Sequence, residues 1–245
     1  MATEQKTDKN VKTTVFNLII LDESGSMSGL TQQTISGCNE TLNVIRSAQN
    51  EAGDDARRSL VSIFAFQNGT EIRSRYLCKN VPIEQVKDIT TADYRPWGNT
   101  PLYDAVGSTL TDLEMVAATH EDATAIVTVI TDGYENSSRH YTGQQVVQMI
   151  SRLKELGWIF NMIGANIDVE REASRLSFDN SMKFQATPEG TREMFSKFSK
   201  SYADEMANMK AEYDMDVEDR IKARKMRKAS FFKRAMGRQI DDEQK

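Results

Sequence analysis

Four short apolar runs constrain the fold of this 245-residue chain more than any other feature of its sequence. The runs are nearly continuous and rich in Val, Ile and Phe, which is typical of strands that are buried on both faces. They cover residues 15–21, 60–66, 123–130 and 158–163. Helical periods lie between them. Strands that alternate with helices predict a doubly wound, mainly parallel sheet with right-handed crossovers.

Two further strands are expected outside these runs. Residues 70–78 alternate loosely and follow Asn68-Gly69, a dipeptide that favours a hairpin turn, so they predict an antiparallel edge strand. Residues 182–185 predict a weaker last strand. The predicted fold class is therefore α/β: a doubly wound, mainly parallel sheet with one antiparallel edge strand, followed by a C-terminal helical extension.

The charge of the chain is divided unevenly between its body and its C-terminal end. Residues 219–245 hold 10 Lys and Arg against 4 Asp and Glu, a net +6, which leaves −11 for residues 1–218. An acidic body argues against a nucleic-acid surface on the globular part. The basic end stays open to two interpretations: a mobile tail, or a segment that contacts an acidic protein, nucleic acid or a membrane surface.

The chain is expected to have three parts. We expect a flexible N-terminus over residues 1–11, an α/β domain over 12–203, and a charged helical extension with a basic tail over 204–245. Because the charged fraction rises beyond about Asp204, the last long helix is expected to leave the core there.

The setting is predicted to be cytoplasmic. Cys38 and Cys78 have no metal-ligand spacing, and the first residues are polar rather than apolar. No apolar run approaches the roughly 18 residues that a transmembrane helix needs. We therefore expect reduced thiols and no transmembrane segment.

Oxygen-bearing side chains lie in three turns next to the predicted strands. Asp22, Ser24 and Ser26 alternate directly after the first apolar run, Thr100 lies in G-N-T-P-L-Y-D, and Asp132 follows the third run in I-T-D-G. Doubly wound sheets bind ligands at the carboxyl ends of their strands, so these turns are expected to converge. Hard divalent cations such as Mg²⁺ prefer oxygen ligands in near-octahedral geometry.

D-x-S-x-S, a lone Thr before a helix and T-D-G, in this order, resemble the von Willebrand factor A domain over roughly residues 12–200. The chain looks like the free-standing intracellular type of bacteria or phage. The resemblance implies a metal-ion-dependent adhesion site for Mg²⁺, with Mn²⁺ or Ca²⁺ as possible substitutes. It implies direct ligation by Ser24, Ser26 and Thr100, with Asp22 and Asp132 acting mainly through bound waters.

In this family a Glu or Asp carboxylate of a partner protein completes the metal shell. The resemblance therefore implies a protein-interaction module, an adaptor or regulator rather than an enzyme, whose partner could be an ATPase or a large assembly. Trp97, Asn99, Asn136 and Tyr141 are expected to form the partner-binding rim. Asp104 is interpreted as a structural hydrogen-bonding group.

Other interpretations stay open at this stage. Asp22 and Ser24 could cap the helix that follows them. Strands ending in Asp22 and Asp132 also resemble haloacid-dehalogenase-type phosphotransfer enzymes, but Ser24 stands where those enzymes need a second acidic residue, and a general acid is missing. In a third interpretation the basic tail is the working part and binds nucleic acid or another acidic surface.

Overall fold

The computed structural model describes residues 11–52, 57–70 and 73–232. Within them, six strands form one sheet in the order β3-β2-β1-β4-β5-β6. All neighbouring pairs are parallel except β2 and β3. The strands are β1 (Thr13–Asp22), β2 (Arg57–Asn68), β3 (Arg73–Pro82), β4 (Asp122–Thr131), β5 (Ile159–Gly164) and β6 (Asn180–Lys183). The predicted α/β fold with a mainly parallel sheet and one antiparallel edge strand is confirmed.

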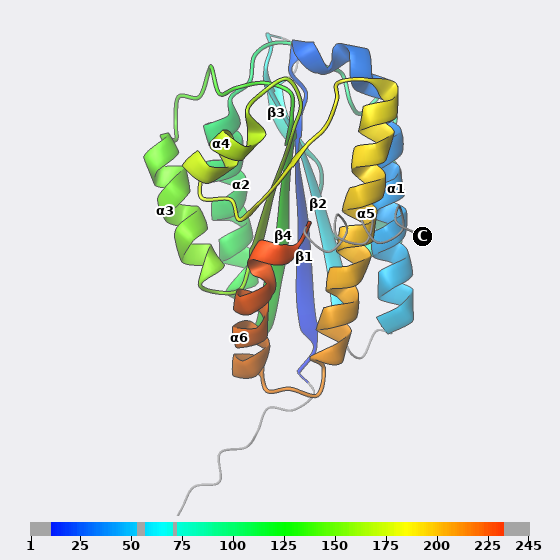
Figure 1. Cartoon of the computed structure of the whole chain (residues 1–245), viewed down its shortest axis with the longest axis vertical. Helices are drawn as coiled ribbons and strands as arrows, with labels where there is room; N and C mark the ends of the chain where they lie inside the picture. Colours follow the sequence, from blue (N-terminus) through cyan, green and yellow to red (C-terminus); the bar gives the residue numbers. More distant parts are fainter. Residues whose placement is uncertain (1–10, 53–56, 71–72, 233–245) are drawn as a thin grey trace, which may run out of the picture.

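Helices cover both faces of this sheet (Figure 1). One layer holds α1 (Thr31–Ala52) and α5 (Pro188–Ala211). The other holds α2 (Leu102–Ala117), α3 (Gly143–Lys154) and α4 (Val169–Arg175). Short 3₁₀ turns, η1 (Gly25–Leu30), η2 (Ile83–Gln85) and η3 (Lys228–Ser230), join these elements.

The central strand β1 explains why the sequence shows continuous rather than alternating apolar runs. All ten of its residues are buried. Val15 and Ile19 pack into the core under α1 and α5, whereas Phe16 and Leu18 pack into the core under α2 and α3. Because both faces of the strand need apolar side chains, the period of two disappears from the sequence.

The prediction that the last long helix leaves the core beyond about Asp204 is wrong. Helix α5 continues to Ala211, and Met206 and Met209 are buried against the sheet. The charged residues in this region are buried in pairs: Glu205 and Glu212 both bind Arg227. A high charged fraction therefore does not mark a solvated helix here.

After α5 the chain turns back through α6 (Val217–Arg227), which lies at the lower left of the molecule in Figure 1. Phe231 and Phe232, which follow η3, are buried in the α1–α5 core, and the Phe231 ring lies 5.9 Å from that of Phe198. The basic segment is thus packed as far as Phe232. Residues 1–10 of the predicted flexible N-terminus, 71–72 of the predicted edge strand, and 233–245 of the predicted tail lie outside the described residues.

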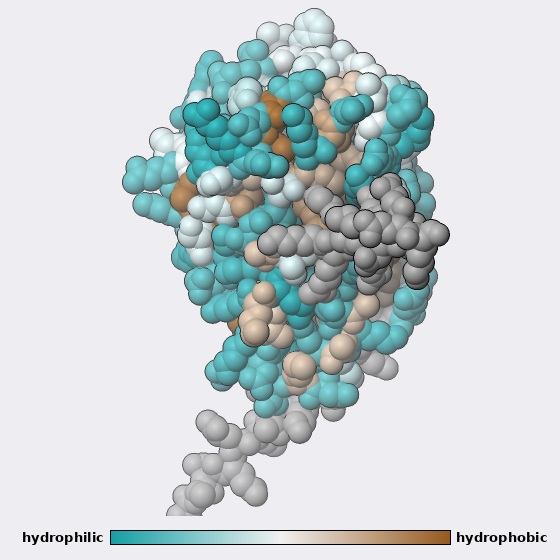
Figure 2. All heavy atoms as spheres, in the orientation of Figure 1, coloured by the Kyte–Doolittle hydropathy of each residue, from teal (hydrophilic) through white to brown (hydrophobic). Residues whose placement is uncertain are grey.

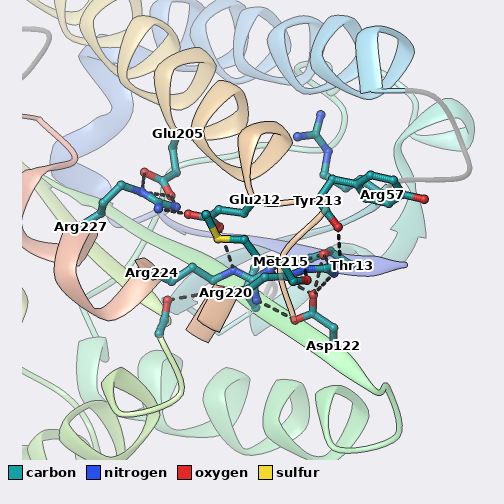
Figure 3. Close-up of polar contacts among 12 residues, drawn as sticks. Thr13, Arg57, Asp122, Glu205, Glu212, Tyr213, Met215, Arg220, Arg224 and Arg227 are labelled. Atoms are coloured by element: carbon teal, nitrogen blue, oxygen red, sulfur yellow. Dashed lines mark hydrogen bonds and ion pairs between the residues drawn. The ribbon is translucent and has the colours of Figure 1, made fainter. Parts of the chain in front are cut away.

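Helix α6 is held by a buried charge cluster, which Figure 3 shows. Arg220 Nη1 lies 2.9 Å and Arg224 Nη1 2.7 Å from the two carboxylate oxygens of Asp122, and all three side chains are 1 % exposed. Thr13 Oγ1 donates to the same carboxylate at 2.6 Å. Asp122 and Thr13 begin β4 and β1, so this cluster, the α6 clasp, closes the amino ends of the two central strands.

The surface of the molecule is mainly polar on the face shown in Figure 2, where hydrophilic side chains predominate. The large apolar side chains that are exposed in the described residues include Trp97 and Tyr134. None of the helices in the described ranges combines the length and the apolar character that crossing a membrane requires.

Candidate metal centre

Asp22, the last residue of β1, is fixed at the carboxyl end of the sheet. Its side chain is fully buried. Oδ1 accepts the backbone N–H of Ser24 at 2.7 Å, Oδ2 accepts the Thr131 hydroxyl at 2.5 Å, and the Tyr94 hydroxyl holds the Asp22 carbonyl at 2.6 Å. Burial raises the pKa of Asp22 to about 6, against the lowering effect of the Thr131 and Ser24 hydrogen bonds, and the nearby charge of Asp132 adds to the rise.

The two serines of D-x-S-x-S connect this strand end to the next one. Ser24 Oγ lies 3.2 Å from Ser26 Oγ, and Ser26 Oγ donates to Asp132 Oδ1 at 2.5 Å. Burial also raises the pKa of Asp132, although the Ser26 hydrogen bond opposes that rise. Within the described chain the Ser24 side chain makes no capping bond to η1, so the capping interpretation of Ser24 is not realised.

Thr100 joins the cluster from a third turn. An ideal Cβ built on Gly133 would lie 3.2 Å from Thr100 Oγ1 and 4.0 Å from Asp22 Oδ2, so both oxygens face the same small space. Asn136 fixes the Thr100 turn, because its Oδ1 accepts the Thr100 N–H at 2.9 Å and its own N–H donates to the Thr100 carbonyl at 3.2 Å. The structure therefore brings together all five residues that the sequence proposed as metal site.

The four predicted rim residues have different surroundings. The backbone N–H of Trp97 donates to the Glu23 carbonyl at 2.8 Å, which holds this residue beside the cluster. Its side chain is open to solvent, because the residue is 65 % exposed. Asn99 is also exposed. Asn136 holds the Thr100 turn, as described above. The Tyr141 ring instead packs over Gly107 of α2, with its hydroxyl 3.1 Å from Thr111 Oγ1, and so lies along the helix rather than at the cluster.

Several supporting residues could not be found from the sequence. Glu23 is fully buried, and its carboxylate binds the Arg75 guanidinium at 2.6 and 3.0 Å, which ties the end of β1 to the edge strand β3. Thr131 orients Asp22, and Tyr94 holds its carbonyl. No short sequence pattern predicts these pairings, because the partners are far apart in the chain.

Asp104 has the structural role predicted for it. Its carboxylate accepts the backbone N–H groups of residues 139–141, each at 2.8 Å. These bonds anchor the loop after β4 to the first turn of α2.

The cluster suits a small, hard cation. With metal–oxygen bonds of about 2.1 Å, neighbouring ligands of an octahedral Mg²⁺ ion lie about 3.0 Å apart, close to the Ser24–Ser26 separation of 3.2 Å. Three of the five side chains are neutral hydroxyls. Over the described residues no group of three or more His, Cys, Asp or Glu side chains could hold a metal ion, so a metal centre here depends on those hydroxyls. Ser26 is exposed, which leaves the cluster open to solvent.

Several solved structures have a fold similar to that of this chain. No protein-family model matches the chain, and no curated protein matches it. Among solved structures, the pilus adhesin SpaC from Lactobacillus rhamnosus GG is similar with a TM-score of 0.58 and 15 % identity, over 80 % of this chain and 31 % of that chain. Proximal thread matrix protein 1 (PTMP1) from the mussel byssus, in a form with a zinc-occupied MIDAS motif, has a TM-score of 0.53 and 15 % identity, over 80 % of this chain and 47 % of that chain.

The chain has its fold in common with SpaC and PTMP1. It spans about a third of the length of the SpaC chain and about half of the PTMP1 chain. The VWA domain of SpRpn10 also matches, with a TM-score of 0.47 and 10 % identity over 76 % of this chain and 94 % of that chain.

Proposed function

We propose that this chain is a divalent-cation-dependent protein-interaction module of the von Willebrand factor A type. One observation carries the proposal: three turns far apart in sequence bring the hydroxyls of Ser24, Ser26 and Thr100 and the carboxylates of Asp22 and Asp132 to one point. That point lies at the carboxyl end of a doubly wound sheet, where such folds bind ligands.

The donor set assigns a role to each side chain. Ser24, Ser26 and Thr100 would ligate the cation directly, with Asp22 and Asp132 acting through bound waters, because hydrogen bonds already engage both oxygens of Asp22. Mg²⁺ is the proposed ion, and Mn²⁺ or Ca²⁺ could replace it. An ion held mainly by neutral hydroxyls and water keeps most of its positive charge, so it attracts a carboxylate from outside. A Glu or Asp of a partner protein would supply that group.

The arrangement supports a docking role over phosphotransfer. A nucleophilic Asp22 would need an accessible carboxylate oxygen, whereas its side chain is fully buried and both oxygens accept hydrogen bonds. We therefore propose that the chain is not an enzyme. In the described basic segment Arg220 and Arg224 are buried, and Lys222 and Lys225 form ion pairs with Glu218 and Glu155, which argues against a nucleic-acid surface there.

The proposed biological role is that of an adaptor or regulator in the cytoplasm. Its partner would belong to an ATPase or another large assembly, as the resemblance implies.

Cation binding provides the test. Titration calorimetry with Mg²⁺ and Mn²⁺ is expected to give saturable binding to the wild type and a loss of at least tenfold in affinity for Ser26→Ala combined with Thr100→Ala. Ser28→Ala is the matched control, because Ser28 is exposed two residues further along η1. Equal affinity in all three proteins, with unchanged thermal unfolding, would remove the basis of the proposal.

A further inference from the structure

A cavity of about 560 Å³ lies directly beside the candidate metal centre. It is bounded by residues 67–70 at the end of β2, by Arg73 and Ser74 at the start of β3, by the start of α2 and by the loop at residues 137–141. Pro101, the residue after Thr100, forms part of its wall. We call this space the hairpin cavity.

Gly98 separates the hairpin cavity from the metal centre. On one side its carbonyl accepts the N–H of Gly25, within D-x-S-x-S, at 3.1 Å. On the other side a Cβ at Gly98 would lie 2.8 Å from the backbone nitrogen of Gly69, which lines the cavity. Gly98 also has a φ of 75°, which glycine adopts without strain. The backbone of Gly98 therefore contacts both the turn that carries Ser24 and Ser26 and the wall of the cavity, so the two spaces are neighbours.

The cavity has unpaired positive charge. Arg73 and Arg139 line it, both are exposed, and within the described ranges neither guanidinium makes a hydrogen bond or ion pair. Asp104 is the carboxylate in its wall. Burial would raise the pKa of Asp104, but the backbone hydrogen bonds from residues 139–141 outweigh it and hold the pKa below its ordinary value. The Asp104 carboxylate is already bound by those three N–H groups. Both arginines can therefore bind another anion.

The rest of the lining fits the aliphatic part of an acidic side chain. Phe64, Ala105 and Tyr141 provide apolar surface. Apolar walls together with two free guanidinium groups are complementary to a glutamate side chain.

We propose that the hairpin cavity binds a second carboxylate of the same partner segment, held by Arg73 and Arg139 while the first carboxylate completes the metal shell. The proposal rests on the metal-dependent docking function proposed above. It defines the partner as an extended protein segment with two acidic residues only a few positions apart, since an extended chain advances about 3.3 Å per residue. The metal centre would then supply affinity for an acid, and the cavity would select partners by the spacing of their acids.

Peptide arrays test this directly with the full-length protein. The probes are Gly-Ser peptides that carry one Glu, or two Glu at each successive spacing, and retention of labelled protein is measured in Mg²⁺ and in EDTA. The test variant combines Arg73→Ala with Arg139→Ala, which keeps the backbone N–H that Asp104 binds. Arg58→Ala combined with Arg171→Ala is the matched control, because both arginines are exposed and neither lines the cavity.

The wild type is expected to retain the best-spaced two-Glu peptide about fivefold to tenfold more strongly than the one-Glu peptide, in Mg²⁺ only. The Arg73/Arg139 variant should lose this gain and keep its one-Glu signal, whereas the control should keep both. A gain that survives in the Arg73/Arg139 variant, or no gain at any spacing while one-Glu retention needs Mg²⁺, would overturn the inference about the cavity alone.

Two other results would overturn more than the selectivity of the cavity. One-Glu retention that is unchanged by EDTA would refute the docking function itself, and with it the second site. A single-stranded oligonucleotide retained in EDTA by the wild type, but not by the Arg73/Arg139 variant, would assign the cavity to nucleic acid and contradict the proposed protein segment.

Discussion

Replacing Asp122 with asparagine is expected to destabilise the protein by about 3 kcal/mol, because it leaves two buried arginines without their counter-charge. The Arg220 and Arg224 side chains are each 1 % exposed and bind opposite oxygens of this carboxylate (Figure 3). Removing one partner of a buried ion pair costs about 3–5 kcal/mol. The lower end applies here, since Arg220 also donates to the carbonyls of Val11, Tyr213 and Met215.

Urea unfolding at neutral pH, followed by circular dichroism, measures this loss. Asp88→Asn is the control, because Asp88 forms an ion pair with Arg46 at 3.1 Å on the surface, where such pairs contribute less than about 1 kcal/mol. A loss below about 1 kcal/mol for Asp122→Asn would refute the reasoning that the α6 clasp holds the C-terminal segment on the sheet. Replacing Asp122, Arg220 and Arg224 together with apolar residues should recover much of the loss, since no charge is then left unpaired.

Three further predictions concern pH, the metal centre and its rim. The hydrogen bonds and charge of Arg224, with help from Thr13 and Arg220, outweigh burial and lower the pKa of Asp122 below its ordinary value of 3.8. The stability that Asp122 contributes is therefore present above about pH 4 and lost as pH falls further, so the urea midpoints of wild type and Asp122→Asn should converge only in acid. Gly133→Ala, whose Cβ would lie 3.2 Å from Thr100 Oγ1, should weaken Mg²⁺ binding about tenfold in calorimetry, whereas Gly29→Ala, with nothing within 4 Å, should not. Trp97→Ala should leave the melting temperature unchanged, because the ring is 65 % exposed, but should reduce Mg²⁺-dependent retention on Glu peptides; equal retention would remove Trp97 from the rim.

The sheet could be predicted from the sequence because each strand is marked by the residue types of its own short segment. Strand β1 is buried on both faces, so its residues form an uninterrupted apolar run. The antiparallel edge strand comes next after β2 along the chain and pairs with it, although Asn68 is the last residue of β2 and neither Asn68 nor Gly69 has a positive φ. The candidate site shares this property in part, because Asp22, Ser24 and Ser26 lie within five residues of one another directly after that strand.

What could not be predicted depends on pairs that are distant in sequence. From sequence alone, the basic run Arg220–Arg227 is expected to be exposed to solvent. In the structure Arg220 and Arg224 bind Asp122, near the middle of the chain, and Arg227 binds Glu205 in the preceding helix. Tyr141 shows the converse. It follows the Asp132 turn closely in sequence, yet its ring packs along α2, because Gly107 leaves a space there for it.

The position of a bound cation tests the central claim most directly. Crystals grown with Mn²⁺ and measured at the manganese absorption edge would give an anomalous difference peak at the ion. We predict one peak at bonding distance, about 2.0–2.5 Å, from the Ser24, Ser26 and Thr100 hydroxyl oxygens, with water between the ion and Asp22. A protein that binds Mn²⁺ at another place, or whose Ser24, Ser26 and Thr100 hydroxyls remain free of the ion at saturating Mn²⁺, would contradict the account.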